Sequence, residues 1–587
     1  MAARESASGS GALRDGGPRR RAEPLEHPSG APRAALGACV LKGEAPRPAL
    51  QSCVADDARV ENRIGSSVVR TLLAMLLAAA TLAAQAPQTG LIGPLPAAAP
   101  ASTFDVTEKS IVQLLAAQRI GTVTSHDLVE KYLARIKAYD RDGPRLTAMV
   151  ALNPHALEQA DALDAERRAG RVRGPLHGIP IVVKDNYATA DMPTTAGSLA
   201  LAGFETGRDA FMVKKLRDAG AVVIGKTNLH ELAYGITTIS SAGGQTRNPY
   251  DPTRNPGGSS GGTGAAVAAS FAAAGMGTDT CGSIRNPSSE NSLWGLRGTI
   301  GLSSRDGIVP LAHSQDIGGP LARTVSDLLL MLDATVGFDA ADPITRDSQS
   351  HIPRTYNGSV GDAGLDDVTI GILRPLFGSA PEDAEVARIV RDAVEEIRTL
   401  GAGVVDVPYD GLDELLRDTS VINAEFKFDL QGFLARFPSA PMHSLGDILA
   451  SGKYHQAVEG VLKRANDVAS ADSESYRTSL SKREQARAAI LSLMNERNIT
   501  AFAYPTLRRK PAVIGQPQNG SNCQLSATTR FPAMSMPAGF TSDGLPVGMD
   551  LLGQPWSEPT LLRVAYAYER AVAPRKPPTT TPPLAAR

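Results

Sequence analysis

The chain has 587 residues and a mass of 61.4 kDa, which is long for one ordinary domain. A net charge of −1 gives no overall field that would hold nucleic acid or acidic lipid. A hydrophobic content of 42% with 21% charged residues is typical of a soluble globular protein. Four cysteines are too few for a disulfide framework in a chain of this length. Composition therefore excludes several classes of protein without selecting a function.

The first hundred residues differ from the rest of the chain. Residues 1–70 are rich in charged residues, Pro, Gly, Ser and Ala and lack apolar periodicity. Such a segment buries too little apolar surface to offset its chain entropy, so we expect a disordered leader. Residues 71–84, TLLAMLLAAATLAA, form an uncharged apolar run that is shorter than the roughly 20 residues of a membrane span.

This apolar run has the surroundings of a secretory signal peptide. Arg63 and Arg70 precede it, and Ala84, Gln85 and Ala86 form a small-residue cleavage site. We therefore expect a signal segment at 71–86, a linker at 87–102, and a protein that is secreted or lies in the periplasm or cell envelope. Sixty residues ahead of a signal peptide are unusual, which favours an internal translation start. A buried Ala-rich helix and an uncleaved membrane anchor remain alternatives.

Two helices are expected at the start of the folded part. Asp105 and Glu108 have the spacing of a capping box ahead of the apolar residues that begin at Ile111, which predicts a first helix. Thr124 and Asp127 open a second helix in the same way.

Short apolar runs then alternate with helical stretches. Strands are predicted at 179–183, 221–224, 501–504, 533–536 and 547–552, and helices at 211–219, 265–274, 486–497 and 561–571. This alternation predicts an α/β fold, a single large domain at 103–575 whose central mixed β-sheet is covered by helices on both faces. Within it, residues 376–500 are expected to form a helical region that shapes the substrate pocket, with Tyr504 and Cys523 near it. Residues 576–587 are expected to be a disordered tail.

A glycine-rich segment at 256–264, PGGSSGGTG, precedes the small-residue helix. It lacks the Lys-[Ser/Thr] pair of a P-loop and the third glycine of a dinucleotide site. Residues 257–261 match G-x-S-x-G, the nucleophile elbow of α/β-hydrolases. An α/β-hydrolase acting through Ser259 and a histidine is therefore one hypothesis.

Two other catalytic motifs are present only in part. His230 and Glu231 begin like a zinc-protease motif, but Tyr234 stands where the second zinc ligand would be, so no metal site is expected. Ser479 and Lys482 match S-x-x-K without the motifs that accompany it in serine enzymes, and we attribute that match to chance.

Three segments carry a more specific pattern in a fixed order. They are residues 178–186 (GIPIVVKDN), the glycine-rich segment 256–264, and residues 277–285 (GTDTCGSIR). Together they resemble the amidase signature family, and the similarity extends more loosely from about 105 to 573. Residues 531–540 and 544–548 look like the C-terminal strands of that family. Two serine loops and a strand lysine in this order are far more specific than any one of them.

The resemblance implies a mechanism as well as a fold. In this family the serine of the third segment, here Ser283, is the nucleophile. The first serine of the glycine-rich segment, Ser259, sits on a cis peptide and relays protons, and the strand lysine, Lys184, is the base. No metal or cofactor takes part. Candidate oxyanion-hole donors are the backbone N–H groups of Thr280, Cys281, Gly282 and Ser283.

The chemistry of serine and lysine fits these roles. A serine hydroxyl is a poor nucleophile until a neighbouring group accepts its proton. Lys184 can accept it only when neutral, so its pKa must fall from about 10.4 toward about 7. That change needs about 4 kcal/mol against the charged form, which burial at a strand end can supply. No histidine is required.

Three further residues are expected to support the site, and one departs from the family. Ser260 should hold the loop, and Asp279 and Arg285 should form an ion pair that fixes the turn. Cys281 stands where the family commonly has glycine; if that position needs positive φ, a cysteine is costly there. It also places a thiol beside the nucleophile. Residues 286–293 (NPSSENSL) and 295–299 (GLRGT) depart from the family pattern too.

The function we expect is hydrolysis of a carboxylic amide to acid and ammonia or amine through an acyl-enzyme on Ser283. The sequence is most similar to stand-alone peptide amidases and broad amidases. A glutaminase-type subunit of an aminoacyl-tRNA amidotransferase and a non-catalytic amidase-like binding protein are the alternatives. The expected partner is a small-molecule or peptide amide. We expect no binding to nucleic acid and no stable membrane association of the mature form. A homodimer remains an alternative to a monomer.

Overall fold

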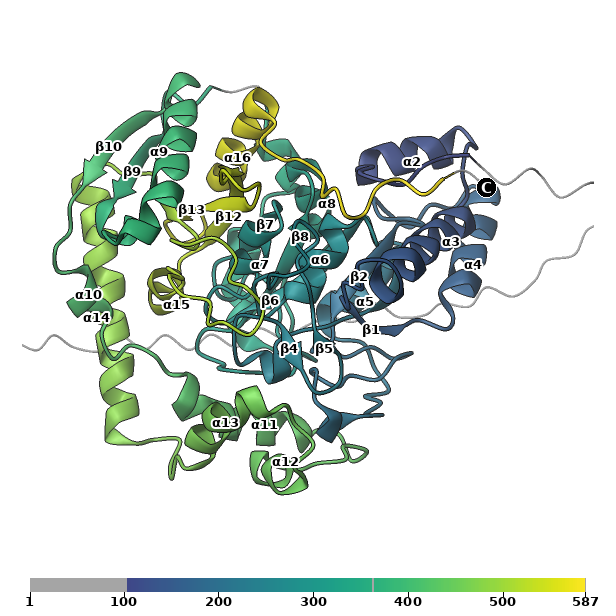
Figure 1. Ribbon diagram of the computed structural model, residues 1–587, viewed down its shortest axis with the longest axis horizontal. Helices are drawn as coiled ribbons and strands as arrows, with labels where there is room; N and C mark the ends of the chain where they lie inside the picture. Colours follow the sequence, from purple (N-terminus) through teal and green to yellow (C-terminus); the bar gives the residue numbers. More distant parts are fainter. Residues whose placement is uncertain (1–102, 362–363, 586–587) are drawn as a thin grey trace, which may run out of the picture. The chain divides into compact units, whose positions relative to one another are not determined.

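A computed structural model describes residues 103–361 and 364–585 (Figure 1). The predicted leader, signal segment and linker lie outside these residues. The chain divides into two units, 1–97 and 98–587, and the fold described below belongs to the second.

A single large sheet forms the centre of this unit. Its eleven strands are β1 (Met149–Leu152), β2 (Pro180–Lys184), β3 (Val222–Thr227), β6 (Ala274–Asp279), β7 (Trp294–Arg297), β8 (Ile317–Ala322), β9 (Thr369–Leu373), β10 (Gly403–Val407), β11 (Ala501–Pro505), β12 (Ala533–Phe540) and β13 (Pro546–Gly553). They lie in the order β1-β3-β2-β6-β8-β7-β12-β13-β11-β9-β10. A separate two-stranded sheet joins β4 (Ile239–Ser240) to β5 (Gly244–Gln245).

The large sheet is mixed. Strand β2 runs parallel to both β3 and β6, and β9 runs parallel to β10 and β11, while the remaining pairs are antiparallel. Because parallel neighbours end at the same edge of a sheet, the last residues of β2 and β6 come side by side. This edge carries the candidate site.

Helices flank the sheet (Figure 1). They are α2 (Ile111–Arg119), α3 (Ser125–Ile136), α4 (Ala156–Arg168), α5 (Phe211–Asp218), α6 (Gly261–Ala268), α7 (Arg285–Glu290), α8 (Val325–Thr335), α9 (Ala384–Thr399), α10 (Leu412–Leu416), α11 (Ile422–Leu434), α12 (Leu445–Ser451), α13 (Glu459–Asn466), α14 (Glu474–Glu496), α15 (Gln524–Thr529) and α16 (Glu558–Val572). Helix α6 packs on β2, β6 and β8, and α9 packs on β11 to β13. The predicted α/β class with a helix-covered mixed sheet is confirmed.

Helices α11 to α13 gather at one end of the molecule, at the bottom of Figure 1. They have a small hydrophobic core of their own, in which Phe426, Phe433 and Leu462 are buried. This core also includes Leu201 and Leu229 from the segments that follow β2 and β3. The helical region is thereby attached to the loops at the edge of the sheet where β2 and β3 end.

Some sequence expectations were wrong in detail. The predicted helix 265–274 ends at Ala268, and Ala274 already begins strand β6. A Cβ on Gly275 would lie 2.5 Å from the side chain of Thr263, so glycine there lets α6 approach the strand closely. The predicted helical stretch 376–500 contains strand β10. The capping box of the first helix is formed by Ser110 and Gln113, not by Asp105 and Glu108.

The expected disordered tail is ordered over 576–585. The buried guanidinium of Arg135 donates to the carbonyl oxygens of Thr581 and Pro582, at 2.8 and 2.9 Å. Tyr250 donates to the carbonyl of Lys576 at 2.5 Å. Sequence alone did not indicate these contacts, because their partners lie between 326 and 447 residues apart along the chain.

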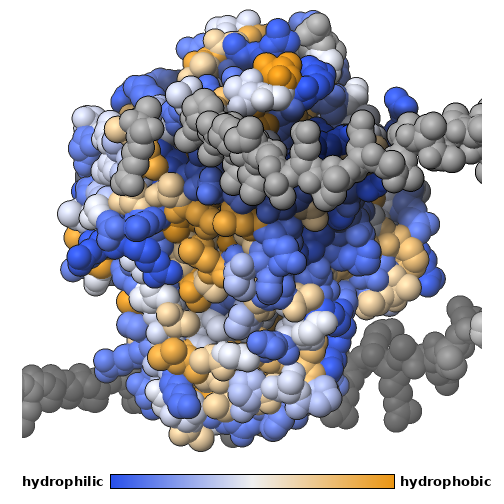
Figure 2. All heavy atoms as spheres, turned by 90° about the vertical axis from the view of Figure 1, so that its right-hand side faces the viewer, coloured by the Kyte–Doolittle hydropathy of each residue, from blue (hydrophilic) through white to orange (hydrophobic). Residues whose placement is uncertain are grey.

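None of the helices in the part that the structure describes is both long and apolar enough to cross a membrane. Figure 2 shows the face on the side of α2 to α4, where hydrophobic residues lie among hydrophilic ones. Val112 and Ile120, in α2 and at its C-cap, are more than half exposed.

Candidate active site

The lysine at the end of β2 is buried and hydrogen-bonded to hydroxyl groups. The Nζ of Lys184 lies 2.8 Å from the Oγ of Ser259 and 2.8 Å from the Oγ1 of Thr278, and its side chain is inaccessible to solvent. Burial lowers the pKa of Lys184 to about 7, against the opposing charges of Asp279 and Asp316. This lysine can therefore hold or accept a proton near neutral pH.

The glycine-rich segment brings Ser259 to the lysine. The peptide bond between Gly258 and Ser259 is cis, as the resemblance implied. The Ser259 carbonyl accepts a hydrogen bond from the N–H of His230 at 3.0 Å. Ser260, the next residue, exchanges hydrogen bonds of 3.2 Å with the N–H and carbonyl of Thr278, which ties the segment to β6.

Ser283 lies in the turn between β6 and α7 and is almost fully buried. Its carbonyl accepts a hydrogen bond of 3.2 Å from the N–H of Ser260. The two serine loops and Lys184 are thus linked through Ser259 and Ser260. The structure brings Lys184 and Ser259 into direct contact and places Ser283 one backbone hydrogen bond from Ser260.

A buried ionic network holds the turn before Ser283. Asp279 forms ion pairs with Arg285 at 3.1 Å and with Arg297 at 3.0 Å, and Arg285 also pairs with Asp550 of β13. Burial alone would raise the pKa of Asp279, but the two guanidinium groups hold it well below its usual range. The carboxylate therefore remains charged and anchors the turn. Arg297 and Asp550 were not among the residues expected here.

The oxyanion prediction needs one correction. The N–H of Gly282 donates to the Asp279 carboxylate at 2.7 Å, so it is not free to bind a substrate oxygen. Within the described residues, the N–H groups of Thr280, Cys281 and Ser283 have no hydrogen-bond acceptor. Three of the four predicted donors therefore remain available.

The expectation of a thiol at Cys281 was wrong, and its position does not need the positive φ that would make a cysteine costly. Its backbone is not in the left-handed region; the positive φ of this turn, 81°, belongs to Gly282. Its sulfur forms a disulfide with Cys523, which directly precedes α15, across a sequence separation of 242 residues. No free thiol stands beside Ser283. The disulfide instead joins the loop of candidate oxyanion donors to the C-terminal part of the chain.

A cavity of about 240 Å³ reaches Thr278, the hydroxyl partner of Lys184, but Lys184, Ser259 and Ser283 are not among the residues that line it. Its wall includes Asn186 and Thr280 on the side of Thr278, and Phe433 and Arg436 from α11 and the residues after it. The helical region thus forms one wall of the cavity. Neither Tyr504 nor Cys523, which we expected near the pocket, lines this cavity, although Cys523 is bonded to Cys281, two residues before Ser283.

Two residues at this site carry signals that the sequence analysis did not use. Thr278 lies one residue before Asp279 in the third motif and bonds directly to Lys184. Asn186 follows Lys184 by two residues and donates to the same Thr278 hydroxyl at 3.0 Å. Both positions stand within the quoted motifs, so the strand alternation could have indicated them.

The comparisons with known proteins agree with this geometry. Residues 127–562 match the family model named Amidase. A probable amidase of Arabidopsis thaliana is 35% identical over 493 residues, covering 81% of this chain and 92% of that protein. A glutamyl-tRNA(Gln) amidotransferase subunit of Chloroflexus aurantiacus is 37% identical over 473 residues, covering 78% of this chain and 95% of that protein.

Among solved structures, native peptide amidase from Stenotrophomonas maltophilia superposes with a TM-score of 0.74 and 39% identity, covering 81% of this chain and 99% of that one. The chain belongs to the amidase family. It is an amide-hydrolysing enzyme, which sets aside both a non-catalytic binding protein and an α/β-hydrolase acting through Ser259 and a histidine.

Proposed function

We propose that Ser283 is the nucleophile, Ser259 the proton relay and Lys184 the base of this amidase. The observation that carries the proposal is the 2.8 Å contact between the Lys184 amine and the Ser259 hydroxyl, at a site where burial lowers the lysine pKa to about 7. A neutral amine in that position can draw a proton through Ser259 from a nearby hydroxyl.

The proposed reaction has two halves. The Oγ of Ser283 attacks the amide carbonyl while its proton passes through Ser259 to Lys184. The tetrahedral oxyanion receives hydrogen bonds from the free N–H groups of Thr280, Cys281 and Ser283. Collapse breaks the C–N bond, and the proton returns from Lys184 to the departing ammonia or amine. Water then attacks the acyl-enzyme by the same route, which releases the acid and restores Ser283.

The proposed substrate is the amide of a short peptide or amino acid. The solved structures that this chain matches include peptide amidases, and one of them is described with the competitive inhibitor chymostatin. A cavity of about 240 Å³ is below the roughly 300–1,000 Å³ of typical ligand pockets, which favours a small substrate.

Ammonia release from a panel of peptide and amino-acid amides tests the triad. Replacing Ser283 with Ala should abolish activity, and Lys184→Met and Ser259→Ala should each lower kcat by at least about 1,000-fold. The matched control is Ser481→Ala, on the surface of α14, which should keep wild-type kcat. Wild-type turnover by Ser283→Ala would overturn the nucleophile assignment.

A glutaminase-type component of an amidotransferase is a second candidate, favoured by the 37% identity with the amidotransferase relative from Chloroflexus aurantiacus. It predicts hydrolysis of free glutamine that increases when partner proteins bind. Hydrolysis of peptide amides by the isolated chain, with little activity on glutamine, separates the two.

We further propose that the protein is exported through the segment 71–86. The Cys281–Cys523 disulfide supports this, because disulfides form and persist in oxidising compartments. The test is N-terminal sequencing of protein from the culture medium and the cell envelope. A mature form beginning at residue 87 is expected, whereas reduced full-length protein in the cytoplasm would contradict export.

A further inference from the structure

The three N–H groups available to an oxyanion belong to peptide units whose carbonyls are held on the opposite side. The carbonyls and their donors are Asp279 with the guanidinium of Arg297, Thr280 with the side-chain amide of Gln315, and Gly282 with the N–H of Asn286. In a trans peptide unit the carbonyl and the N–H of the next residue point in opposite directions. A hydrogen bond that fixes the carbonyl therefore also fixes the direction in which that N–H points.

Gln315 holds the peptide unit that carries the N–H of Cys281. It lies in the segment before β8 and is 1% exposed, and its Nε2 donates to the Thr280 carbonyl at 3.2 Å. Its own backbone carbonyl accepts from Arg297 at 2.8 Å. Both the backbone and the side chain of Gln315 are therefore held, and the Cys281 N–H is turned away from Gln315.

The other end of the Gln315 amide contacts a buried arginine of α14. The guanidinium of Arg483 donates to the Oε1 of Gln315 at 2.7 Å, and it also donates to the carbonyls of Thr419 and Ala527, at 3.2 and 2.8 Å. A guanidinium only donates, so the Gln315 atom that it contacts is the oxygen, and the atom that faces Thr280 is the NH₂ group. Arg483 thereby fixes the direction of the bond from Gln315 to Thr280.

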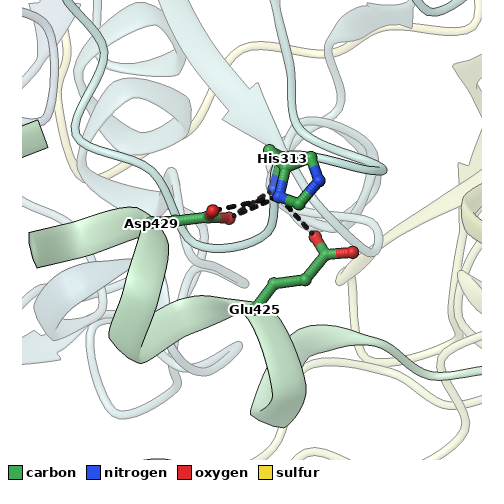
Figure 3. A group of neighbouring side chains, drawn as sticks. All are labelled: His313, Glu425 and Asp429. Carbon is green, nitrogen blue, oxygen red and sulfur yellow. Dashed lines mark hydrogen bonds and ion pairs between the residues drawn. The ribbon is translucent and has the colours of Figure 1, made fainter. Parts of the chain in front are cut away.

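The segment that carries Gln315 is attached to a second helix as well. The imidazole of His313, two residues earlier, lies against Asp429 and Glu425 of α11, at 2.9 and 3.3 Å (Figure 3). The position of Gln315 thus depends on α11 and α14, two helices that carry no residue of the candidate triad.

The hydrogen bonds of Arg483 listed above all go to amide oxygens, so no carboxylate neutralises it by direct contact. Its side chain is 1% exposed. Burial lowers the pKa of Arg483 to about 10, with Arg530 adding to the effect and Glu425 opposing it, so the guanidinium remains charged at neutral pH. In a buried chain of hydrogen bonds a charged donor polarises the bonds that follow it. The positive charge therefore strengthens Gln315 as a donor and, through the Thr280 carbonyl, the N–H of Cys281.

We propose that Gln315 and Arg483 are positioning residues of the oxyanion hole: Gln315 aims the Cys281 N–H at the tetrahedral intermediate, and Arg483 fixes and polarises Gln315. Neither touches the substrate. This inference rests on the proposed function, in which Ser283 attacks the amide and the N–H groups of this loop receive the oxyanion. Because the oxyanion forms only after the substrate is bound, changes at these two positions should lower kcat and leave KM unchanged.

The first test measures kcat and KM for propionyl-alaninamide, an uncharged peptide amide. Gln315→Met keeps a long side chain without its amide and should lower kcat at least about tenfold at unchanged KM. Arg483→Met should act in the same direction, and Arg483→Lys, which keeps the charge, should retain more activity than Arg483→Met. Both residues act through one peptide unit, so the double variant Gln315→Met/Arg483→Met should be no slower than the slower single variant. Wild-type kcat in Gln315→Met, or losses that multiply in the double variant, would overturn the inference.

Gln118 and Arg167 provide matched controls. Gln118 is 4% exposed, accepts from Arg167 at 2.9 Å and donates to the Gly178 carbonyl at 3.2 Å, at the end of β2 opposite to Lys184. Gln118→Met and Arg167→Met therefore remove the same kinds of bond away from the site, and they should lower the free energy of unfolding while keeping wild-type kcat. A fall in kcat of Gln118→Met as large as that of Gln315→Met would contradict a positioning role, because general loosening of the fold would explain both.

Inhibition by propionyl-alaninal separates an effect on the oxyanion hole from a loss of folded protein. Addition of the Ser283 Oγ to this aldehyde gives a hemiacetal whose oxygen takes the place of the oxyanion, so the inhibition constant should rise in Gln315→Met by about the factor by which kcat/KM falls. Gln315→Glu keeps a contact for Arg483, but its carboxylate cannot donate to Thr280, and it should show the same loss even if Gln315→Met does not fold.

The aldehyde also distinguishes this inference from the proposed function. Wild-type affinity for propionyl-alaninal in folded Gln315→Glu would overturn the positioning role while leaving Ser283 as the nucleophile. Wild-type affinity in Ser283→Ala would instead refute the proposed function, because the aldehyde would then bind without the serine.

Discussion

The hydroxyl of Thr280 donates a hydrogen bond of 2.5 Å to the buried carboxylate of Asp316. Thr280 belongs to the loop before Ser283, whereas Asp316 ends a short segment whose residues His313 and Ser314 contact α11. The same carboxylate accepts from the N–H groups of Leu311 and Ala312. Residues 311–316 therefore connect the candidate oxyanion loop with the helical wall of the cavity.

Replacing Thr280 with valine removes that donor and keeps the side-chain volume. We expect a loss of about 1–3 kcal/mol in the free energy of unfolding, because Asp316 keeps a buried oxygen without its partner. We also expect kcat to fall about tenfold as the loop shifts. Denaturant unfolding and steady-state kinetics measure the two effects. As a control, Thr355→Val removes a similar bond to Asp333 far from the site, and it should lower stability while keeping wild-type kcat. If Thr280→Val also kept wild-type kcat, the proposed role of Thr280 in the oxyanion loop would be refuted.

The rate should depend on pH through Lys184. Burial lowers the pKa of this lysine to about 7, so the amine is protonated below that pH and cannot accept a proton. For an uncharged amide, kcat/KM should rise about tenfold per pH unit below about 7 and level off above it. Propionyl-alaninamide is suitable because it does not titrate in this range. A flat profile from about pH 5.5 to about pH 8.5 would contradict a lysine base.

Reduction of the disulfide should weaken both the fold and the reaction. In the chain-entropy model a cross-link over 242 residues raises the free energy of the unfolded state by about 5.5 kcal/mol, and measured effects are typically about 2–4 kcal/mol. We expect the reduced protein to lose that much stability and to have a lower kcat. The Cys281→Ser/Cys523→Ser double variant should reproduce both losses and no longer respond to reductant. An unchanged kcat after complete reduction, measured by thiol titration, would show that the link serves stability alone.

Removing residues 576–587 should destabilise the enzyme. Arg135 is buried, and the deletion takes away two of the carbonyl oxygens that its guanidinium contacts. The expected loss is about 2–3 kcal/mol in the free energy of unfolding. A shorter deletion of 584–587 keeps Thr581 and Pro582 and should change little. Equal thermal midpoints for the two truncated proteins would contradict this role of the tail.

Local motifs were sufficient to predict part of the fold and the core of the site. Lys184, Ser259 and Ser283 each lie in a short pattern that fixes its own turn or strand end, and parallel pairing of β2 with β6 then brings them together. The strand predicted at 179–183 was recognisable because it is a continuous apolar run, and the strand at 547–552 because it is apolar apart from Asp550. Strand β10 was missed although three of its five residues are valines, because it is short, mostly exposed and lies within a stretch of charged helices.

The contacts that could not be predicted join residues distant in sequence. The partner of Cys281 lies 242 residues away, and neither cysteine stands in a local pattern that indicates pairing. Asp429 is an ordinary acidic residue in the sequence of α11, and its place in the cavity wall depends on how that helix packs. The bond between the Gly282 N–H and the Asp279 carboxylate is different, because these residues are only three apart and their spacing is visible in the sequence.

The turn that holds Ser283 has both of its distant anchors near the end of the chain. Cys281 is bonded to Cys523, and Arg285 to Asp550. A polypeptide synthesised only as far as α14 already contains Lys184, Ser259 and Ser283 but lacks Cys523 and Asp550. Its turn can then be held by nearer contacts such as Asp279–Arg297 and Thr280–Asp316. Because the N-terminal part is synthesised first, the turn gains these two links only after the residues up to β13 have been made.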